Sequence, residues 1–322
     1  MAYRFEPGEP VPGAVRRILR EELESAAREL SRARSAAARD LAIHEARKSI
    51  KKSRALLRLL LPELKGVYAA ENPRLRELGL RLSEARDAVV MLETLSHLEE
   101  KYNEELDARA LVPVRRALAR RKREHEHQAR SAALLHRTAA ALRAAARRMK
   151  AWPLDGNGFV ALATGFKRTF RRGRQALADA RKHPVPENDH TLRKRVKDHW
   201  YHVRLLEDFA GNRLEAYERS LKDLETWLGE CHNLVVLRET LRAEPSAFGP
   251  PEAVSALAGL IDHHERALRA KALALGGRIY GRKPGPLVRG IERLWNARQP
   301  DKATLSAVPV ASGKRAARPG RR

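Results

Sequence analysis

The residues best suited to chemistry in this chain are histidine, arginine and lysine at helical spacing, in two segments 146 positions apart. Each segment begins with a histidine, continues with an Arg-Lys pair three residues later, and has a lysine seven residues after the histidine. Guanidinium forks and compact ammonium groups both bind phosphate oxygens. The spacing therefore indicates a surface for a phosphate-rich polyanion. The candidate residues are His44, Arg47, Lys48, Lys51, Arg54 and Arg58 in the first segment, and His190, Arg193, Lys194, Lys197 and Arg204 in the second.

On a helix, these basic residues share one face about 120° wide in each segment. Ala46, Ile50 and Leu57 lie on the opposite face of the first segment and predict a buried apolar stripe. Neither basic face contains an acid, although mixed charges at i,i+4 would stabilise a solvated helix. A bound polyanion would relieve the repulsion, so we expect both faces to turn inward onto one acid-free channel. The alternative is a solvated cationic surface without a ligand.

The two histidines head their basic faces at equivalent positions. Neighbouring positive charge disfavours the imidazolium form, and a bound phosphate favours it. Either phosphate hydrogen bonding or metal ligation is compatible with the pattern. We expect the former for His44 and His190, and we predict no metal site and no cofactor. The chain has one cysteine, Cys231, which excludes a cysteine-built zinc or iron–sulfur site.

The two segments belong to a longer internal repeat. Aligned without a gap, residues 44–95 and 190–241 share 17 identities in 52 positions. The match extends to Leu-Ser-Glu over Leu-Gly-Glu and to Val-Val over Val-Val. A repeated unit usually cannot bury its apolar face alone. The repeat therefore predicts two halves packed on a shared core.

The chain is predicted to be helical from about residue 14, because alanine, leucine, arginine and glutamate dominate. No segment alternates apolar and polar residues long enough to predict a strand. Proline and glycine clusters, among them Glu71-Asn72-Pro73, are predicted to end helices. We predict an all-α fold of two similar halves, each with three or four long helices. Its parts are an extended lead-in (1–13), a folded region (14–296, with halves at about 14–150 and 158–296) and a basic disordered tail (297–322).

The formal charge of +25 and pI near 10.9 favour a polyanionic partner: nucleic acid, an anionic membrane surface or a phosphate polymer. The amino-terminal residues do not resemble a secretory signal, and apolar stretches are far too short for a membrane span. We therefore expect a soluble cytoplasmic protein with no membrane partner. The sequence gives no indication of an oligomeric state.

The pattern His-x-x-Arg-Lys-x-[Ile/Val]-Lys, followed in each half by Leu-[Ser/Gly]-Glu and Val-Val, resembles the CHAD domain, the conserved histidine α-helical domain. The resemblance covers about residues 10–296. It implies two pseudo-symmetric bundles around a basic groove or pore, binding of inorganic polyphosphate, and location at polyphosphate granules. Mapped onto this sequence, it implies that the eleven basic residues named above face the polymer.

The second half departs from the pattern in two places. Trp200 stands at the position of Arg54, and Asp198 at the position of Lys52, so we expect the second half to carry the weaker charge. Other basic helical stripes are candidates for a further part of the wall. One group is Arg168, Arg171 and Arg172, which cannot all face the same way. The other is Arg120, Arg123 and His127, a stripe that is equally consistent with an exposed helix face.

We predict that the protein is not an enzyme. The sequence has no Gly-rich phosphate loop, no Gly-x-Ser-x-Gly elbow and no His-Glu-x-x-His pair. The predicted function is non-enzymatic polyphosphate binding. Two alternatives remain: a non-specific nucleic-acid-associated protein, although aromatic residues for base stacking are few, and a granule-surface scaffold protein.

Overall fold

The computed structural model describes residues 3–129, 131–156, 158–210 and 212–298; the side chains of 84–88 and 125–129 fall outside that description. Within these ranges the chain forms α-helices and two short 3₁₀ helices, with no strand, which confirms the predicted all-α class. The α-helices are α1 (Val11–Arg32), α2 (Ala36–Leu59), α3 (Lys65–Arg81), α4 (Glu84–Lys101), α5 (Val112–Ala129), α6 (Ala132–Arg148), α7 (Val160–Lys182), α8 (Pro186–Arg204), α9 (Glu207–Ala210), α10 (Asn212–Ala243), α11 (Pro251–Tyr280) and α12 (Pro284–Ala297). The 3₁₀ helices are η1 (Met149–Ala151) and η2 (Pro245–Ala247).

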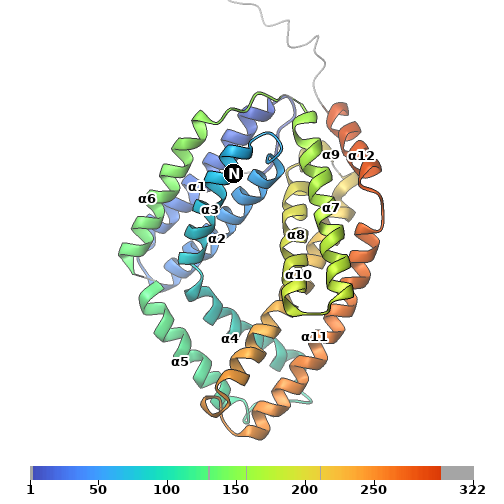
Figure 1. The fold of residues 1–322 in the computed structure, drawn as a ribbon. Helices are drawn as coiled ribbons and strands as arrows, with labels where there is room; N and C mark the ends of the chain where they lie inside the picture. The colour runs from blue at the N-terminus through green and yellow to red at the C-terminus, as the bar shows by residue number, and fades with distance from the viewer. Residues whose placement is uncertain (1–2, 130, 157, 211, 299–322) are drawn as a thin grey trace, which may run out of the picture.

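The buried side chains of the described residues form three hydrophobic clusters. One joins α1, α2, α3 and α6 with the end of α8 and with α12, and another joins α7, α8, α10 and α11. The third combines both halves, because α4 and α5 pack with the second part of α10 and the first part of α11. In Figure 1 this mixed bundle lies at the bottom of the molecule. The halves also meet where α2 packs against α8.

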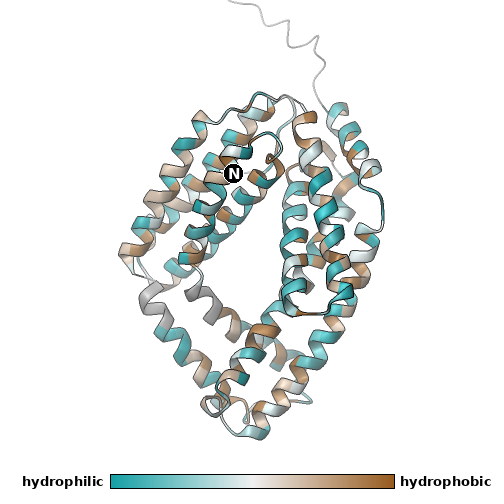
Figure 2. Ribbon diagram, in the orientation of Figure 1, coloured by the Kyte–Doolittle hydropathy of each residue, from teal (hydrophilic) through white to brown (hydrophobic). Residues whose placement is uncertain are grey.

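The amphipathic pattern that predicted the helices is visible in the structure. Ala46, Ile50 and Leu57 of α2 are buried, as predicted. Figure 2 shows hydrophilic and hydrophobic segments alternating along helices such as α8. No helix of the described chain combines the length and apolar character that crossing a membrane requires.

The duplicated segments do not fold identically. In the first half, α3 ends at Arg81 and α4 begins at Glu84, whereas the equivalent stretch of the second half continues through the 32-residue helix α10. The break lies at Leu82-Ser83, where the Ser83 hydroxyl donates to the Gly79 carbonyl at 3.1 Å. Two guanidinium hydrogen bonds from Arg47 to the Leu82 and Ser83 carbonyls satisfy backbone groups that the helix end leaves open.

The predicted helix end at Glu71-Asn72-Pro73 is wrong, because α3 continues through Pro73. Pro73 is exposed, so the carbonyl that loses its partner can face water. Glu71 is buried and accepts two hydrogen bonds from Arg148 of α6, which anchors this part of α3. Even so, the described part of the first half holds six α-helices, more than the three or four long helices predicted.

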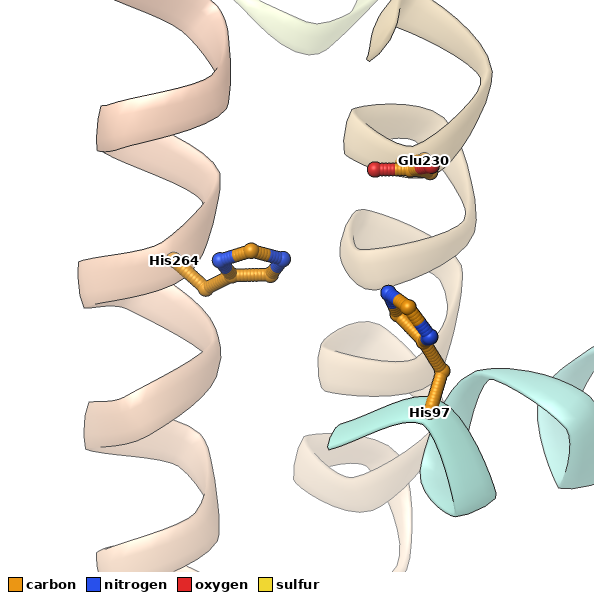
Figure 3. Close-up of side chains that lie close together, drawn as sticks. All are labelled: His97, Glu230 and His264. Atoms are coloured by element: carbon orange, nitrogen blue, oxygen red, sulfur yellow. The ribbon is translucent and has the colours of Figure 1, made fainter. Parts of the chain in front are cut away.

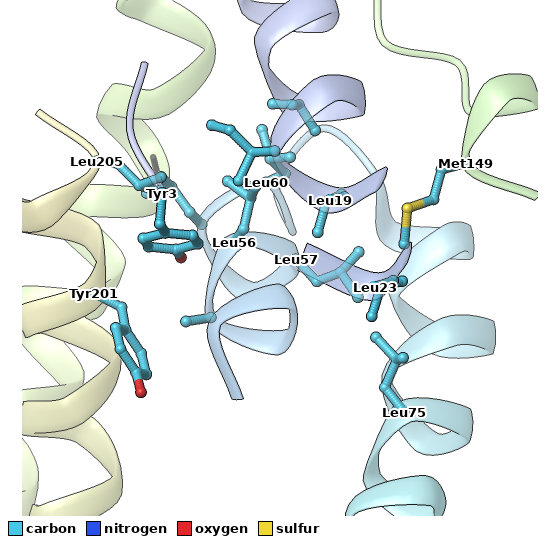
Figure 4. Packing of buried hydrophobic residues seen from close by; sticks show 14 of the residues in the cluster. Tyr3, Leu19, Leu23, Leu56, Leu57, Leu60, Leu75, Met149, Tyr201 and Leu205 are labelled. Atoms are coloured by element: carbon cyan, nitrogen blue, oxygen red, sulfur yellow. The ribbon is translucent and has the colours of Figure 1, made fainter. Parts of the chain in front are cut away.

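The predicted lead-in also takes part in the core. Helix α1 begins at Val11, three residues earlier than predicted. Figure 4 shows Tyr3 between Leu205 and the leucines of α2. The Tyr3 hydroxyl donates to the Lys52 carbonyl at 3.0 Å, and the Phe5 amide donates to the Leu205 carbonyl at 2.9 Å. The amino-terminal segment therefore links α2 to the end of α8. Most of the predicted tail, residues 299–322, lies outside the described chain.

Candidate functional site

A cavity of about 600 Å³ lies between α2 and α8, with walls completed by α4 and α10. We call it the central pocket. Eight of the eleven predicted residues line it, and they come from both halves of the chain. These are His44, Arg47, Lys48 and Lys51 of α2, and His190, Arg193, Lys194 and Lys197 of α8. The first turns of the two basic segments thus line the same cavity.

Helix α10 adds residues that the sequence analysis did not assign to the site. Lys222 and His232 line the central pocket, and Glu93 of α4 is the one carboxylate among its described lining residues. A basic residue at this position recurs in the repeat, because Arg76 is the equivalent of Lys222. That recurrence was a signal from which Lys222 could have been identified.

The prediction of an acid-free channel is wrong on the α8 side. The buried Glu225 carboxylate lies 2.7 Å from Lys197 Nζ, 3.7 Å from Arg193 Nε and 3.4 Å from Lys222 Nζ. These cations lower the pKa of Glu225 against the opposing effect of burial. The acid comes from the facing helix, so the helical wheel of α8 could not reveal it. Its equivalent in the first half is Gly79, so the repeat gave no indication either.

The α2 side of the pocket carries Lys51 without such a carboxylate. Among the described residues Lys51 forms no ion pair, although its side chain is open to solvent within the pocket. Desolvation by the pocket walls, followed by repulsion from Lys197 and Arg47, lowers the pKa of Lys51 to about 7. Lys48 Nζ is 3.2 Å from the Glu45 carboxylate on the outer edge of α2. An anion in the pocket would favour the charged form of Lys51.

The histidines of the second half form a close pair. The rings of His190 and His232 lie 4.5 Å apart, and the buried Nδ1 of His190 has no hydrogen-bond partner in the structure. Desolvation, then Lys194 and Arg193, lowers the pKa of His190. Desolvation and the same cations also lower the pKa of His232 to about 4. His44, by contrast, is exposed at the rim, with Nε2 3.9 Å from Glu45 Oε1.

Three predicted residues do not line the central pocket. Arg58 Nη1 donates to Asp198 Oδ1 at 2.9 Å, and Arg54 Nε donates to Asn72 Oδ1 at 3.0 Å. The Arg204 guanidinium lies over the Trp200 ring at 5.2 Å. The departures noted in the sequence explain two of these placements. Asp198 attracts Arg58, and Trp200 offers a ring face to Arg204, the repeat equivalent of Arg58.

Arg54 and Arg58 belong instead to a second group of cations, which we call the arginine cluster: Arg54, Arg58, Arg168, Arg172 and Arg195, arranged around Asp198. It is built from α2, α7 and α8. Desolvation and the neighbouring guanidinium of Arg58 lower the pKa of Arg54 to about 10. Lys194 connects the two groups, because it lines the central pocket and its pKa is lowered by desolvation, Arg195 and Arg58.

The further wall residues behave differently from one another. Arg168 and Arg172 join the arginine cluster, while Arg171 is an exposed residue outside the central pocket. Arg120 and Arg123 are exposed on α5, where Arg120 pairs with Glu124 at 3.8 Å, and neither lines the pocket. The side chain of His127 lies outside the described residues.

Cationic side chains already lie against the aromatic rings of the pocket. Lys222 Nζ lies 4.7 Å from the centre of the Trp200 ring, and Arg204 also lies over that ring. Lys197 Nζ is 6.0 Å from the Tyr201 ring. These contacts leave the pocket suited to phosphate groups rather than to stacked bases.

Comparison with known proteins agrees with this architecture. The family model described as the CHAD domain matches residues 17–242. The chain is also similar to a solved structure, the crystal structure of the CHAD domain from the plant Ricinus communis. That similarity has a TM-score of 0.57 at 19% identity and covers 85% of this chain and 95% of the plant chain. At this identity it shows the fold alone. No curated protein sequence matches the chain.

Proposed function

This chain belongs to the CHAD domain family, and we propose that it binds inorganic polyphosphate in the central pocket without catalysing a reaction. The observation that carries the proposal is the meeting of α2 and α8. Their basic faces come from distant parts of the sequence and line one cavity with seven lysine and arginine residues once Lys222 of α10 is included. Such a concentration of like charge raises the electrostatic free energy of the folded protein unless an anion compensates it.

The charge arrangement supports a polymer rather than a single phosphate. Lys194 joins the central pocket to the arginine cluster, so cationic side chains continue from one group to the other. A chain of phosphates could neutralise both groups at once. Affinity would then come mainly from phosphate neutralisation and counterion release, so binding should weaken steeply with salt. For seven neutralised cations the slope of log K against log salt is about −5.

Charge reversal within the pocket tests the proposal. The double variant Lys51→Glu, Lys194→Glu removes two exposed ammonium groups, one from each half. The matched control is Arg147→Glu, Lys150→Glu, which makes the same charge change at exposed positions of α6 and η1. We expect the pocket variant to lose at least about tenfold in polyphosphate affinity, with the control within about twofold of wild type. Equal losses in two folded variants would refute the assigned site.

The absence of catalysis is part of the proposal. The described titratable lining of the pocket consists of cations, histidines, Tyr201 and Glu93, and burial raises the pKa of the Tyr201 hydroxyl. This lining offers no nucleophile activated by an adjacent base. We expect no release of phosphate when polyphosphate is incubated with the protein at stoichiometric concentration. Phosphate release that a pocket variant abolishes would contradict this part of the proposal.

Nucleic acid is the competing ligand, because net charge alone would attract it. The cations above Trp200 and near Tyr201 argue against base stacking. We expect long-chain polyphosphate to displace DNA at far lower phosphate concentration than DNA needs to displace polyphosphate. The reverse order would favour the nucleic-acid function.

We further propose a cytoplasmic location at polyphosphate granules, which rests on the family resemblance. A fluorescently tagged chain should form foci in cells that synthesise polyphosphate and lose them when synthesis is abolished. A granule-surface scaffold would instead keep its foci without the polymer.

A further inference from the structure

A cluster of potential metal-binding side chains lies in the mixed bundle of α4, α5, α10 and α11, and none of its members lines the central pocket. His97 of α4, Glu230 of α10 and His264 of α11 each offer a ligand atom, and these atoms lie within 4.8 Å of one another. Figure 3 shows the three side chains converging from three helices. They border a cavity of about 160 Å³. One residue comes from the first half of the chain and two come from the second.

His264 is the residue that most needs an explanation. It is 3% exposed, and its buried Nε2 has no hydrogen-bond partner in the structure. Its other ring nitrogen, Nδ1, lies 2.9 Å from the Tyr102 hydroxyl. If Nδ1–H donates to this oxygen, the lone pair of Nε2 remains available toward the cavity. An imidazole with one nitrogen hydrogen-bonded and the other unpartnered is the arrangement that metal-binding histidines adopt.

We propose that His97, Glu230 and His264 bind a divalent transition-metal ion, zinc foremost, that ties α4 of the first half to α10 and α11 of the second. Two imidazoles and one carboxylate are an established ligand set for zinc, with water in the fourth position. Ligand atoms about 2.1 Å from a tetrahedral zinc lie roughly 3.4 Å apart, so atoms within 4.8 Å of one another must approach by up to about 1.4 Å. His97 is exposed and Glu230 is half-buried, so both side chains have room to close around the ion while His264 stays fixed.

The protonation state of His264 is compatible with ligation. Desolvation, then the charges of Lys101, His97 and His263, lowers the pKa of His264 to about 4. The ring is therefore neutral near neutral pH, and no proton has to be displaced from Nε2 before a metal binds. The nearby ammonium of Lys101 opposes a cation, whereas the Glu230 carboxylate supplies the compensating negative charge.

Zinc titration of the full chain without polyphosphate tests the site, with isothermal calorimetry and thermal unfolding as readouts. The test variants are His97→Ala and Glu230→Gln, at positions that are not buried, so that folding is preserved. His263→Ala removes the exposed neighbouring histidine on α11 as the matched control. His232→Ala controls for zinc captured by the His190–His232 pair in the central pocket.

We expect wild type, His263→Ala and His232→Ala to bind one zinc ion with the same affinity at this site, and each test variant to bind at least about tenfold more weakly. At a hundredfold excess over the wild-type Kd, zinc should raise the Tm of wild type by about 5 °C and that of His97→Ala by at most about half as much. Test variants that bind zinc as tightly as His263→Ala would overturn the proposal. So would a loss of binding confined to His232→Ala. The two cavities share Glu93 and Asn233, but none of the three proposed ligands lines the central pocket. His97→Ala should therefore keep its polyphosphate affinity, and either proposal can fail without the other.

Discussion

At the scale of single residues, the central pocket combines groups whose protonated forms are disfavoured. Lys51, Lys197, Lys194 and His190 all have pKa values lowered by desolvation and by neighbouring cations. Negative charge in the pocket would reverse each of these shifts, because it favours the protonated form of every group. Binding of a polyanion is therefore coupled to proton uptake.

Lys51 gives this coupling a measurable pH range. Its pKa is about 7 without ligand and rises when phosphates bind, so protons are taken up on binding above pH 7. Affinity should consequently fall as pH rises from 7, by about tenfold at pH 8.5. Lys51→Met should flatten this dependence, while Lys150→Met should leave it unchanged. Calorimetry in buffers of different ionisation enthalpy measures the uptake directly, and identical heats for wild type in all buffers at pH 8 would disprove it.

The Glu225 carboxylate stabilises the fold but is expected to weaken polyphosphate binding. Its carboxylate holds Lys197, Arg193 and Lys222 together, yet it places negative charge beside the pocket. We expect Glu225→Gln to destabilise the protein by about 2 kcal/mol, since three cations lose their buried partner. The same variant should bind polyphosphate more tightly and regain thermal stability when the polymer is added. Chemical denaturation and binding titrations measure the two effects, and a fall in both stability and affinity would contradict this role.

At the scale of helices, the repeat predicted α2 and α8 well because their amphipathic patterns are strong and local. It did not predict that one copy of the Leu-[Ser/Gly]-Glu motif breaks a helix while the other continues within α10. The difference depends on tertiary contacts. Arg47 donates to carbonyls at the break, whereas the Arg193 guanidinium lies near Glu225. Arg193 also packs beside Gly229, where an added Cβ would lie 3.1 Å from the Arg193 guanidinium. The intact α3 helix at Pro73 depends likewise on its exposed position, which sequence alone does not reveal.

Arg47 should therefore matter to stability in a way that its repeat equivalent does not. Arg47→Met removes two hydrogen bonds from the end of α3, and we expect a loss of about 1 kcal/mol in the free energy of unfolding. Arg47→Met and Arg193→Met should reduce polyphosphate affinity to a similar degree. Arg193→Met should, however, leave the α10 backbone hydrogen bonds intact. Hydrogen exchange around residues 78–83 provides the readout. Equal protection in wild type and Arg47→Met would show that Arg47 does not maintain the break.

At the scale of the whole molecule, the pocket exists because two distant helices meet, and the arginine cluster extends the cationic surface beyond it. The sequence indicated which residues were basic, but not how they would divide between these two groups. Nor could any spacing indicate that His97, Glu230 and His264 converge, because the three residues lie on separate helices of the mixed bundle. Such groupings arise from helix packing.

Chain length should separate the two cationic groups. A phosphate chain short enough for the central pocket should bind Arg54→Met, Arg168→Met as tightly as wild type, within about twofold. A long chain that also reaches the arginine cluster should bind this variant about tenfold more weakly, because fewer phosphates are neutralised. Titration with chains of defined length makes the comparison, with Arg147→Met, Lys150→Met as the control. An equal loss for short and long chains would mean that the two groups form one site.

The most direct test of the account is an experimental structure of the protein bound to a polyphosphate of defined length. We predict phosphate oxygens within hydrogen-bonding distance of Lys51 of α2 and of Lys194 and Lys197 of α8, so that one polymer contacts both halves. A polymer bound on the outer surface, or contacting only one of the two helices, would contradict the central claim.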